Sequence, residues 1–203
     1  TGGETQGVLI AATSAALFLL VLVRMSGLVR RVEEQASELA RVARTDALTD
    51  IPNRRGWDEQ LAVELARAER AEAPVCIALL DIDHFKAYND SAGHSAGDRL
   101  LRAAATAWRG ELRSMDILAR YGGEEFGVVL PGCSAQGAAP IVDRLRALTP
   151  EGQSTSAGVA VWDRVETAEA LVDRADRALY AAKHAGRDRT VVAQPAAVMR
   201  LVA

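Results

Sequence analysis

The chain of 203 residues carries a formal net charge of −3, with 49% hydrophobic residues and two cysteines. This length is sufficient for one globular domain and an additional segment. The slightly acidic balance argues against a nucleic-acid-binding surface, and two cysteines are too few for a disulfide scaffold. We therefore expect a domain from a reducing compartment that has no nucleic-acid partner.

The first notable segment is a charge-free run, GVLIAATSAALFLLVLV, at residues 7–23. A run of this length is at the lower limit for crossing a bilayer, so we expect a transmembrane helix at 7–25. Three arginines follow the run and Glu4 precedes it. The positive-inside rule then predicts the inner or cell membrane as the location, with the downstream domain in the cytoplasm. A buried core helix is the alternative.

Residues 26–44 are predicted to form a linker helix between this span and the domain. Its apolar and amide positions are spaced by 4, 3, 4 and 3 residues, namely Leu28, Val32, Gln35, Leu39 and Val42. This spacing is typical of the a/d seam of a coiled coil. It favours a short parallel coiled coil, whereas an amphipathic helix packed on its own domain is the alternative.

Residues 45–193 are predicted to form a globular α+β domain. Residues 194–203 are predicted to be a tail. The hydrophobic patterns predict helices at 52–71, 95–112, 134–148 and 167–186, and strands at 74–82, 116–121, 125–130, 154–162 and 189–193. Without the first and last helices and the last edge strand, the core order is β-α-β-β-α-β, the split βαβ pattern of ferredoxin-like folds. Gly122 and Gly123 are expected to form the hairpin turn with positive φ.

Acidic residues are concentrated at the end of the first strand and at the tip of this hairpin. In a split βαβ sheet the first strand lies beside the central hairpin, which brings Asp81 close to Glu124 and Glu125. Carboxylates from two strands repel each other unless a cation bridges them. Oxygen ligands at a strand end suit Mg²⁺, with phosphates completing the coordination shell. A solvated acidic loop is the alternative.

Cationic groups lie where they could bind phosphates. The chain has only two lysines, Lys86 and Lys183. Phe85 and Lys86 follow the acidic strand end directly, where a turning chain offers free N–H groups and an ammonium. Lys183 and Arg187 end the last helix, where complementing the helix dipole is the alternative explanation.

Two further side chains could recognise a base. Asn89 and Asp98 carry amide and carboxylate groups that could form paired hydrogen bonds with a guanine edge. His94 has no partner at helical spacing, so we expect a loop or phosphate contact rather than a metal ligand. Carboxylates, a cation and phosphate binders together indicate phosphoryl or nucleotidyl transfer.

Five separated blocks resemble the motifs of GGDEF-family diguanylate cyclases. In chain order they are DALTDIPNRR at 46–55, DIDHFKAYNDSAGHSAGD at 81–98, RYGGEEF at 120–126, TSAGVA at 155–160 and ADRALYAAKHAGRDR at 175–189. The resemblance covers residues 45–190 and implies a nucleotidyl-cyclase palm. Glu124 replaces the Asp of the family name, and Asp188 stands where the family often has Asn.

The resemblance implies that two GTP molecules are condensed to cyclic di-GMP and two pyrophosphates across a membrane-tethered homodimer. Mg²⁺, or alternatively Mn²⁺, would bind with two ions per active site. The implied metal ligands are Asp81, the carbonyl of Ile82 and Glu124, and Glu125 would lie near the 3′-hydroxyl or the metal. The implied substrate contacts are Phe85, Lys86, Lys183 and Arg187 for the triphosphate, Asn89 and Asp98 for guanine, and His94.

The sequence RSMD at 113–116 resembles the RxxD product-inhibition site of the same family. Arg113 and Asp116 would then bind cyclic di-GMP, for which the planar guanidinium fork of arginine is suited. A salt bridge at a helix end is the alternative explanation of this short pattern. The alternative function for the whole chain is a catalytically inactive receptor for cyclic di-GMP.

Overall fold

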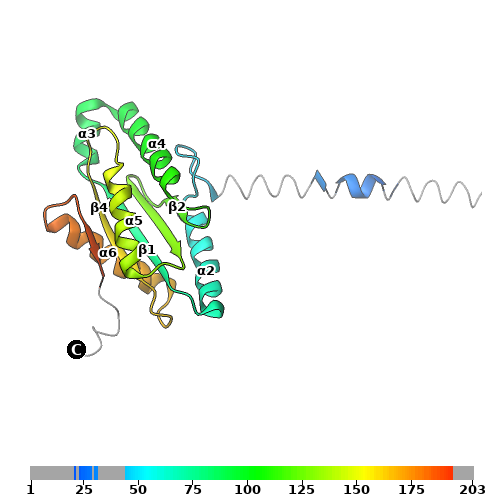
Figure 1. Cartoon of the computed structure of the whole chain (residues 1–203). Helices are drawn as coiled ribbons and strands as arrows, with labels where there is room; N and C mark the ends of the chain where they lie inside the picture. Colours follow the sequence, from blue (N-terminus) through cyan, green and yellow to red (C-terminus); the bar gives the residue numbers. More distant parts are fainter. Residues whose placement is uncertain (1–20, 22, 29, 32–43, 194–203) are drawn as a thin grey trace, which may run out of the picture. The chain divides into compact units, whose positions relative to one another are not determined.

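The computed structural model describes residues 21, 23–28, 30–31 and 44–193 (Figure 1). The chain divides into two parts at Arg44. In the first part, the described residues are helical. Within the described ranges, no helix is both long enough and apolar enough to cross a membrane. The predicted span at 7–25 and coiled-coil seam lie mostly outside the described residues, and the tail at 194–203 lies entirely outside them.

The second part contains a five-stranded sheet and helices that cover it (Figure 1). The helices are α2 (Arg54–Ala71), α3 (Phe85–Ala92), α4 (His94–Glu111), α5 (Ala135–Ala147) and α6 (Ala168–His184). The strands are β1 (Val75–Ile82), β2 (Ile117–Arg120), β3 (Glu125–Pro131), β4 (Thr155–Val161) and β5 (Thr190–Val192). Every element predicted for residues 45–193 is present, and the predicted α+β class is confirmed.

The exception to the predicted pattern is α3, a helix that the hydrophobic patterns did not indicate. Its eight residues, FKAYNDSA, bury only Phe85, so they carry almost no apolar periodicity. Gly93, with φ of 87°, separates α3 from α4. A helix this short depends on tertiary contacts rather than on intrinsic propensity.

The strand order is β2-β3-β1-β4-β5. β1 lies at the centre and pairs antiparallel with β3 and with β4, whereas β5 pairs parallel with β4 at the edge. This is the arrangement that the split βαβ prediction requires, with the first strand beside the central hairpin.

Two hydrophobic cores cover the two faces of the sheet. Cys76, Ala78 and Leu80 of β1 pack in the core that α4 and α5 cover, whereas Ile77 and Leu79 pack in the core of α2 and α6. Because successive side chains of a strand point to opposite faces, a fully buried strand of this kind is apolar throughout. The strand therefore delivers its polar residues only at its end, where Asp81 and Asp83 lie.

Candidate active site

Acidic groups from β1 and from the β2–β3 turn meet at one end of the sheet. The antiparallel register pairs Asp81 with Glu125. The amide of Ile82 donates a hydrogen bond to the carbonyl of Glu124 with an N–O distance of 3.3 Å. The structure thus brings together the acids that strand pairing was expected to place side by side.

Lys183 places an ammonium group against Asp81. It lies in the last turn of α6, and its Nζ is 2.7 Å from Oδ2 of Asp81. Burial raises the pKa of Asp81, and Asp83 adds to the rise, whereas Lys183 opposes it; the net pKa is above the ordinary value of 3.8. A carboxylate in this position requires a cation, and here Lys183 provides it.

Glu124 is half-buried in the same acidic group. Burial is the main cause of its raised pKa, the charges of Asp81 and Glu125 raise it further, and Lys183 acts in the opposite direction. Asp81 and Glu125 are therefore close enough to disfavour the ionised form of Glu124. A cation between them would remove that repulsion.

The glycine pair of the turn allows a side chain to approach the backbone closely, and it does not adopt a left-handed backbone conformation. Neither Gly122 nor Gly123 has a positive φ, so the prediction on their conformation was wrong. A Cβ atom on Gly122 would lie 2.6 Å from Oε2 of Glu125, whereas one on Gly123 would meet nothing within 4 Å. Gly122 makes room for the Glu125 side chain, and Gly123 leaves its side of the turn open.

Arg120 ties this turn to the loop that enters the domain. Its Nε and Nη2 donate to the carbonyl of Gly123 at 3.1 and 2.8 Å, and its Nη1 donates to both carboxylate oxygens of Asp46 at 3.1 Å each. Thr49 donates to Asp46 through its amide and its hydroxyl. Burial raises the pKa of Asp46, but these hydrogen bonds outweigh it and hold the pKa below its ordinary value. No pattern in the sequence indicated this connection.

Helices α3 and α4 bring Asn89 next to Asp98. Oδ1 of Asn89 lies so close to Gly97 that a Cβ atom there would be 1.9 Å away. This Oδ1 is buried without a hydrogen-bond partner among the described residues, and Asp98, the residue after Gly97, is exposed. A buried unpaired polar atom is a group that a ligand donor can satisfy, so the pair suits a base with N–H groups.

The remaining predicted contacts lie at the starts of these two helices. Phe85 is buried in the core and begins α3, so only its backbone is available to a ligand. The first amides of a helix lack intrahelical acceptors, and the exposed Lys86 adds a positive charge there. His94 is exposed at the first position of α4.

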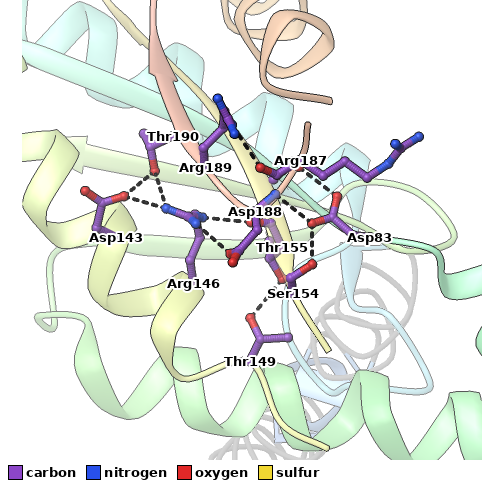
Figure 2. A network of polar contacts seen from close by, with 11 residues as sticks. Asp83, Asp143, Arg146, Thr149, Ser154, Thr155, Arg187, Asp188, Arg189 and Thr190 are labelled. Atoms are coloured by element: carbon purple, nitrogen blue, oxygen red, sulfur yellow. Dashed lines mark hydrogen bonds and ion pairs between the residues drawn. The ribbon is translucent and has the colours of Figure 1, made fainter. Parts of the chain in front are cut away.

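Arg187 follows α6 in a left-handed turn. Gly186 has φ of 107°, and the amide of Arg187 donates to the carbonyl of Ala182 at 3.1 Å, as in a Schellman motif. Gly186, the residue after the C-cap Ala185, therefore ends α6. The Arg187 side chain is exposed and extends away from its neighbours (Figure 2), and its charge lowers the pKa of Asp81.

Asp83 has a structural role that its sequence neighbours did not indicate. It is 2% exposed, and it accepts hydrogen bonds from the hydroxyls of Ser154 and Ser156 at 2.7 Å each. It also accepts one from the amide of Asp188 at 3.1 Å (Figure 2). Because all of these partners are more than 70 positions away in the chain, no local pattern revealed them.

The acidic group suits an open magnesium site better than a closed structural one. In the described part of the chain, no three His, Cys, Asp or Glu side chains form a cluster that could hold a metal ion. Two carboxylates at a strand end, beside an open glycine, leave several coordination positions for phosphate and water, which Mg²⁺ prefers. The ammonium of Lys183 against Asp81 shows that this position favours a cation.

Arg113 and Asp116 lie in the connection between α4 and β2. Oδ2 of Asp116 accepts from the backbone amide of Arg113 at 3.0 Å, so the two residues close a turn. Among the residues that the structure describes, their side chains form no ion pair. Both residues line an open pocket of about 430 Å³, together with Arg144 of α5. This pocket leaves the guanidinium of Arg113 exposed to a ligand.

Comparison with known proteins identifies the family whose motifs the sequence resembles. Residues 43–189 match the family model "Diguanylate cyclase, GGDEF domain". The chain is 45% identical over 161 residues to diguanylate cyclase DgcP of Pseudomonas aeruginosa, covering 74% of this chain and 24% of that protein. It is 38% identical over 169 residues to the probable diguanylate cyclase DgcE of Escherichia coli, covering 78% and 15%. The chain thus spans a quarter or less of these relatives.

Among solved structures, the coiled coil and GGDEF domain of DgcB from Caulobacter crescentus, in complex with c-di-GMP, superimposes with a TM-score of 0.78. The two share 32% sequence identity, and the match covers 85% of this chain and 97% of that one. Family model, relatives and structure agree over the domain that follows Arg44. The chain belongs to the family of GGDEF diguanylate cyclase domains.

Proposed function

We propose that this chain condenses two GTP molecules into cyclic di-GMP and releases two pyrophosphates. The observation that carries the proposal is the meeting of Asp81 with Glu124 and Glu125 at the end of β1, where a lysine compensates their charge. Membership of a diguanylate cyclase family supports it, as does the name of the relative DgcP.

In this proposal Asp81, Glu124 and the carbonyl of Ile82 hold Mg²⁺, for which Mn²⁺ could substitute, with two ions per site. When bound, the metal would supply charge neutralisation for the phosphates. Lys183, now paired with Asp81, would bind the triphosphate together with Arg187. Glu125 stays close to the turn and faces the attacking 3′-hydroxyl or the metal.

Asn89 and Asp98 select guanine. A carboxylate at position 98 accepts from the N1–H and the N2–H of guanine, and adenine offers no such pair of donors. The unpaired Oδ1 of Asn89 supports a role for this residue in the same recognition. The site therefore favours GTP over ATP, and Lys86 and His94 add contacts to the phosphates that both nucleotides share.

The reaction joins two nucleotides, so we propose that two copies of the domain face each other in a homodimer. The match to a structure of DgcB that includes a coiled coil supports a role for residues 26–44 in this pairing. The charge-free run at 7–23 is proposed to anchor the chain in the inner membrane, with the cyclase domain in the cytoplasm.

The test is product formation by the purified 203-residue chain with GTP and Mg²⁺, measured by chromatography and mass spectrometry. We expect cyclic di-GMP from the wild type and none from Glu124→Gln. Glu69→Gln, at an exposed position of α2, is the matched control and should leave the rate unchanged. Equal rates with ATP, or an active Glu124→Gln variant, would contradict the proposal.

Product inhibition is proposed to act through Arg113 and Asp116. Added cyclic di-GMP should slow the wild type, whereas Arg113→Ala should lose this inhibition and keep its turnover. Binding of cyclic di-GMP to Arg113 without any turnover of GTP would instead support an inactive receptor.

A further inference from the structure

We propose that Arg146 is a positioning residue for Arg187, and that it acts by holding Asp188. The inference rests on the proposed function, because the phosphate contact of Arg187 belongs to that function. Arg146 lies at the C-terminal end of α5, on a different element from any of the proposed substrate contacts.

The turn that carries Arg187 has an unfavourable backbone. Gly186, Arg187 and Asp188 have φ values of 107°, 59° and 46°. Glycine adopts this left-handed region freely, but two adjacent residues with side chains persist there only when surrounding contacts hold them. The contacts that hold the turn therefore determine the position of the Arg187 backbone and the direction in which its side chain leaves it.

Asp188 is held from its backbone and from its side chain (Figure 2). Its amide donates to Oδ2 of Asp83 at 3.1 Å. Its Oδ1 accepts from Nη2 of Arg146 at 2.7 Å. The two anchors come from different elements, one from the end of β1 and one from α5. Together they fix both the position and the rotation of the Asp188 peptide.

Arg146 is itself immobilised, which allows it to serve as an anchor. Its Nε donates to the carbonyl of Thr155 at 2.7 Å, and its Nη1 donates to Asp143 at 2.8 Å. Only 13% of its side chain is exposed. With Thr190, which accepts from Nη1 at 3.4 Å, and Asp188, the guanidinium has four different partners, and a lysine could not reproduce that geometry.

Arg187, by contrast, is fixed at its backbone and exposed at its head group. Its amide is bonded to Ala182, and its carbonyl accepts from Nε of Arg189 at 2.9 Å. The side chain itself extends into solvent, and its charge reaches Asp81. This arrangement fixes the backbone from which the side chain extends, which lowers the backbone entropy lost when a phosphate binds.

The test measures KM and kcat for GTP, together with the affinity for a non-hydrolysable GTP analogue with Mg²⁺ by calorimetry. Arg146→Met should raise KM and weaken analogue binding about 5- to 10-fold, with kcat within about twofold, because only the binding of phosphate is impaired. Arg187→Ala should have a larger effect, roughly 10- to 100-fold. Arg146→Met removes the ion pairs with Asp143 and Asp188; the control Arg55→Met removes the ion pair with Glu59 on α2 and should change neither constant.

A double-mutant cycle separates positioning from a general structural effect. If Arg146 acts through Arg187, then Arg146→Met should add less than about twofold to the loss in an Arg187→Ala chain. Hydrogen exchange of the Asp188 amide should also become faster in Arg146→Met. Full additivity of the two losses, or an unchanged exchange rate, would overturn the proposal.

Two variants at position 188 keep the proposal testable if Arg146→Met does not fold. Asp188→Gly retains the left-handed backbone but removes the acceptor, so it should weaken analogue binding as Arg146→Met does. Asp188→Asn retains an acceptor oxygen and should bind close to the wild type. Tight binding by Asp188→Gly would overturn the proposal. If the wild type makes no cyclic di-GMP, the proposed function is refuted but the positioning role of Arg146 is not. Analogue binding and hydrogen exchange of the Asp188 amide test that role without any turnover.

Discussion

Substituting Asp46 by asparagine tests how firmly the entry loop is tied to the signature turn. Asp46→Asn keeps the shape of the side chain and one acceptor oxygen, but it removes the charge that Arg120 contacts through both carboxylate oxygens. Arg120 also holds the carbonyl of Gly123, so a weakened pair loosens the turn beside the acidic group. We expect a loss of both unfolding free energy and GTP turnover.

The size of the loss follows from the exposure of the pair. The side chains of Arg120 and Asp46 are 17% and 22% exposed. Fully exposed pairs contribute about 0–1 kcal/mol, and removing one partner of a buried pair costs about 3–5 kcal/mol. Because this pair is mostly buried and Asn retains the hydrogen bonds from Thr49, we expect a loss of about 1–2 kcal/mol at neutral pH.

Urea unfolding of the wild type and the variant over a pH series provides the measurement. The pKa of Asp46 in the folded chain is below its ordinary value of 3.8. Its contribution to stability is therefore complete above pH 3.8 and disappears as the pH falls through the lower, folded value. The difference between the two proteins should shrink over the same range. Asp50→Asn, exposed and left-handed in the same loop, should show no difference. A difference that does not change with pH would refute the reasoning.

Three further predictions concern the core. Gly158→Ala should unfold the domain or cost at least about 3 kcal/mol, because the new Cβ atom would lie 2.1 Å from a backbone oxygen of α6. The control Gly110→Ala adds a Cβ atom that meets no other atom within 4 Å, so it should stabilise the domain by about 0.5–1 kcal/mol. Thermal unfolding measures both changes. Glu166→Gln should cost about 3–5 kcal/mol in urea unfolding, because the buried guanidinium of Arg174 loses its charged partner. Burial raises the pKa of Cys76 to about 12, so iodoacetamide should modify this thiol only after unfolding, as mass spectrometry can show.

The elements that the sequence predicted well are those whose own periodicity reports their surroundings. β1 is apolar from Val75 to Leu80 because it lies between two cores, and α4 shows an apolar face because one side packs on the sheet. The eight residues of α3 bury a single side chain, so they offered no such pattern. The expected positive φ at the glycine pair failed for a related reason. There a neighbouring side chain, Glu125, and not the backbone, excludes a Cβ atom.

In the candidate site, too, some residues could be predicted from the sequence pattern and others could not. Strand order alone places Asp81 beside Glu125, so two residues far apart in the chain can be paired from the sequence pattern. Asp83 and Arg146 gave no such signal, because their partners depend on how the α5–β4 and α6–β5 connections return to the end of β1. An acidic residue two positions after a metal-ligand candidate resembles a second ligand in sequence. Only the hydroxyl groups around Asp83 show that its oxygens are already occupied.

The acidic group also explains why one of the two lysines of the chain lies at position 183. Before a nucleotide binds, the domain must fold with Asp81 almost fully buried and with two glutamates close by, an arrangement that raises the pKa of Asp81 and of Glu124. Lys183, held by α6, supplies a cation at 2.7 Å without occupying the site permanently. Its flexible stem would let the ammonium turn from Asp81 to a phosphate, whereas a bidentate arginine would bind Asp81 more rigidly. The same side chain can thus stabilise the acidic group in the folded domain and contribute to nucleotide binding.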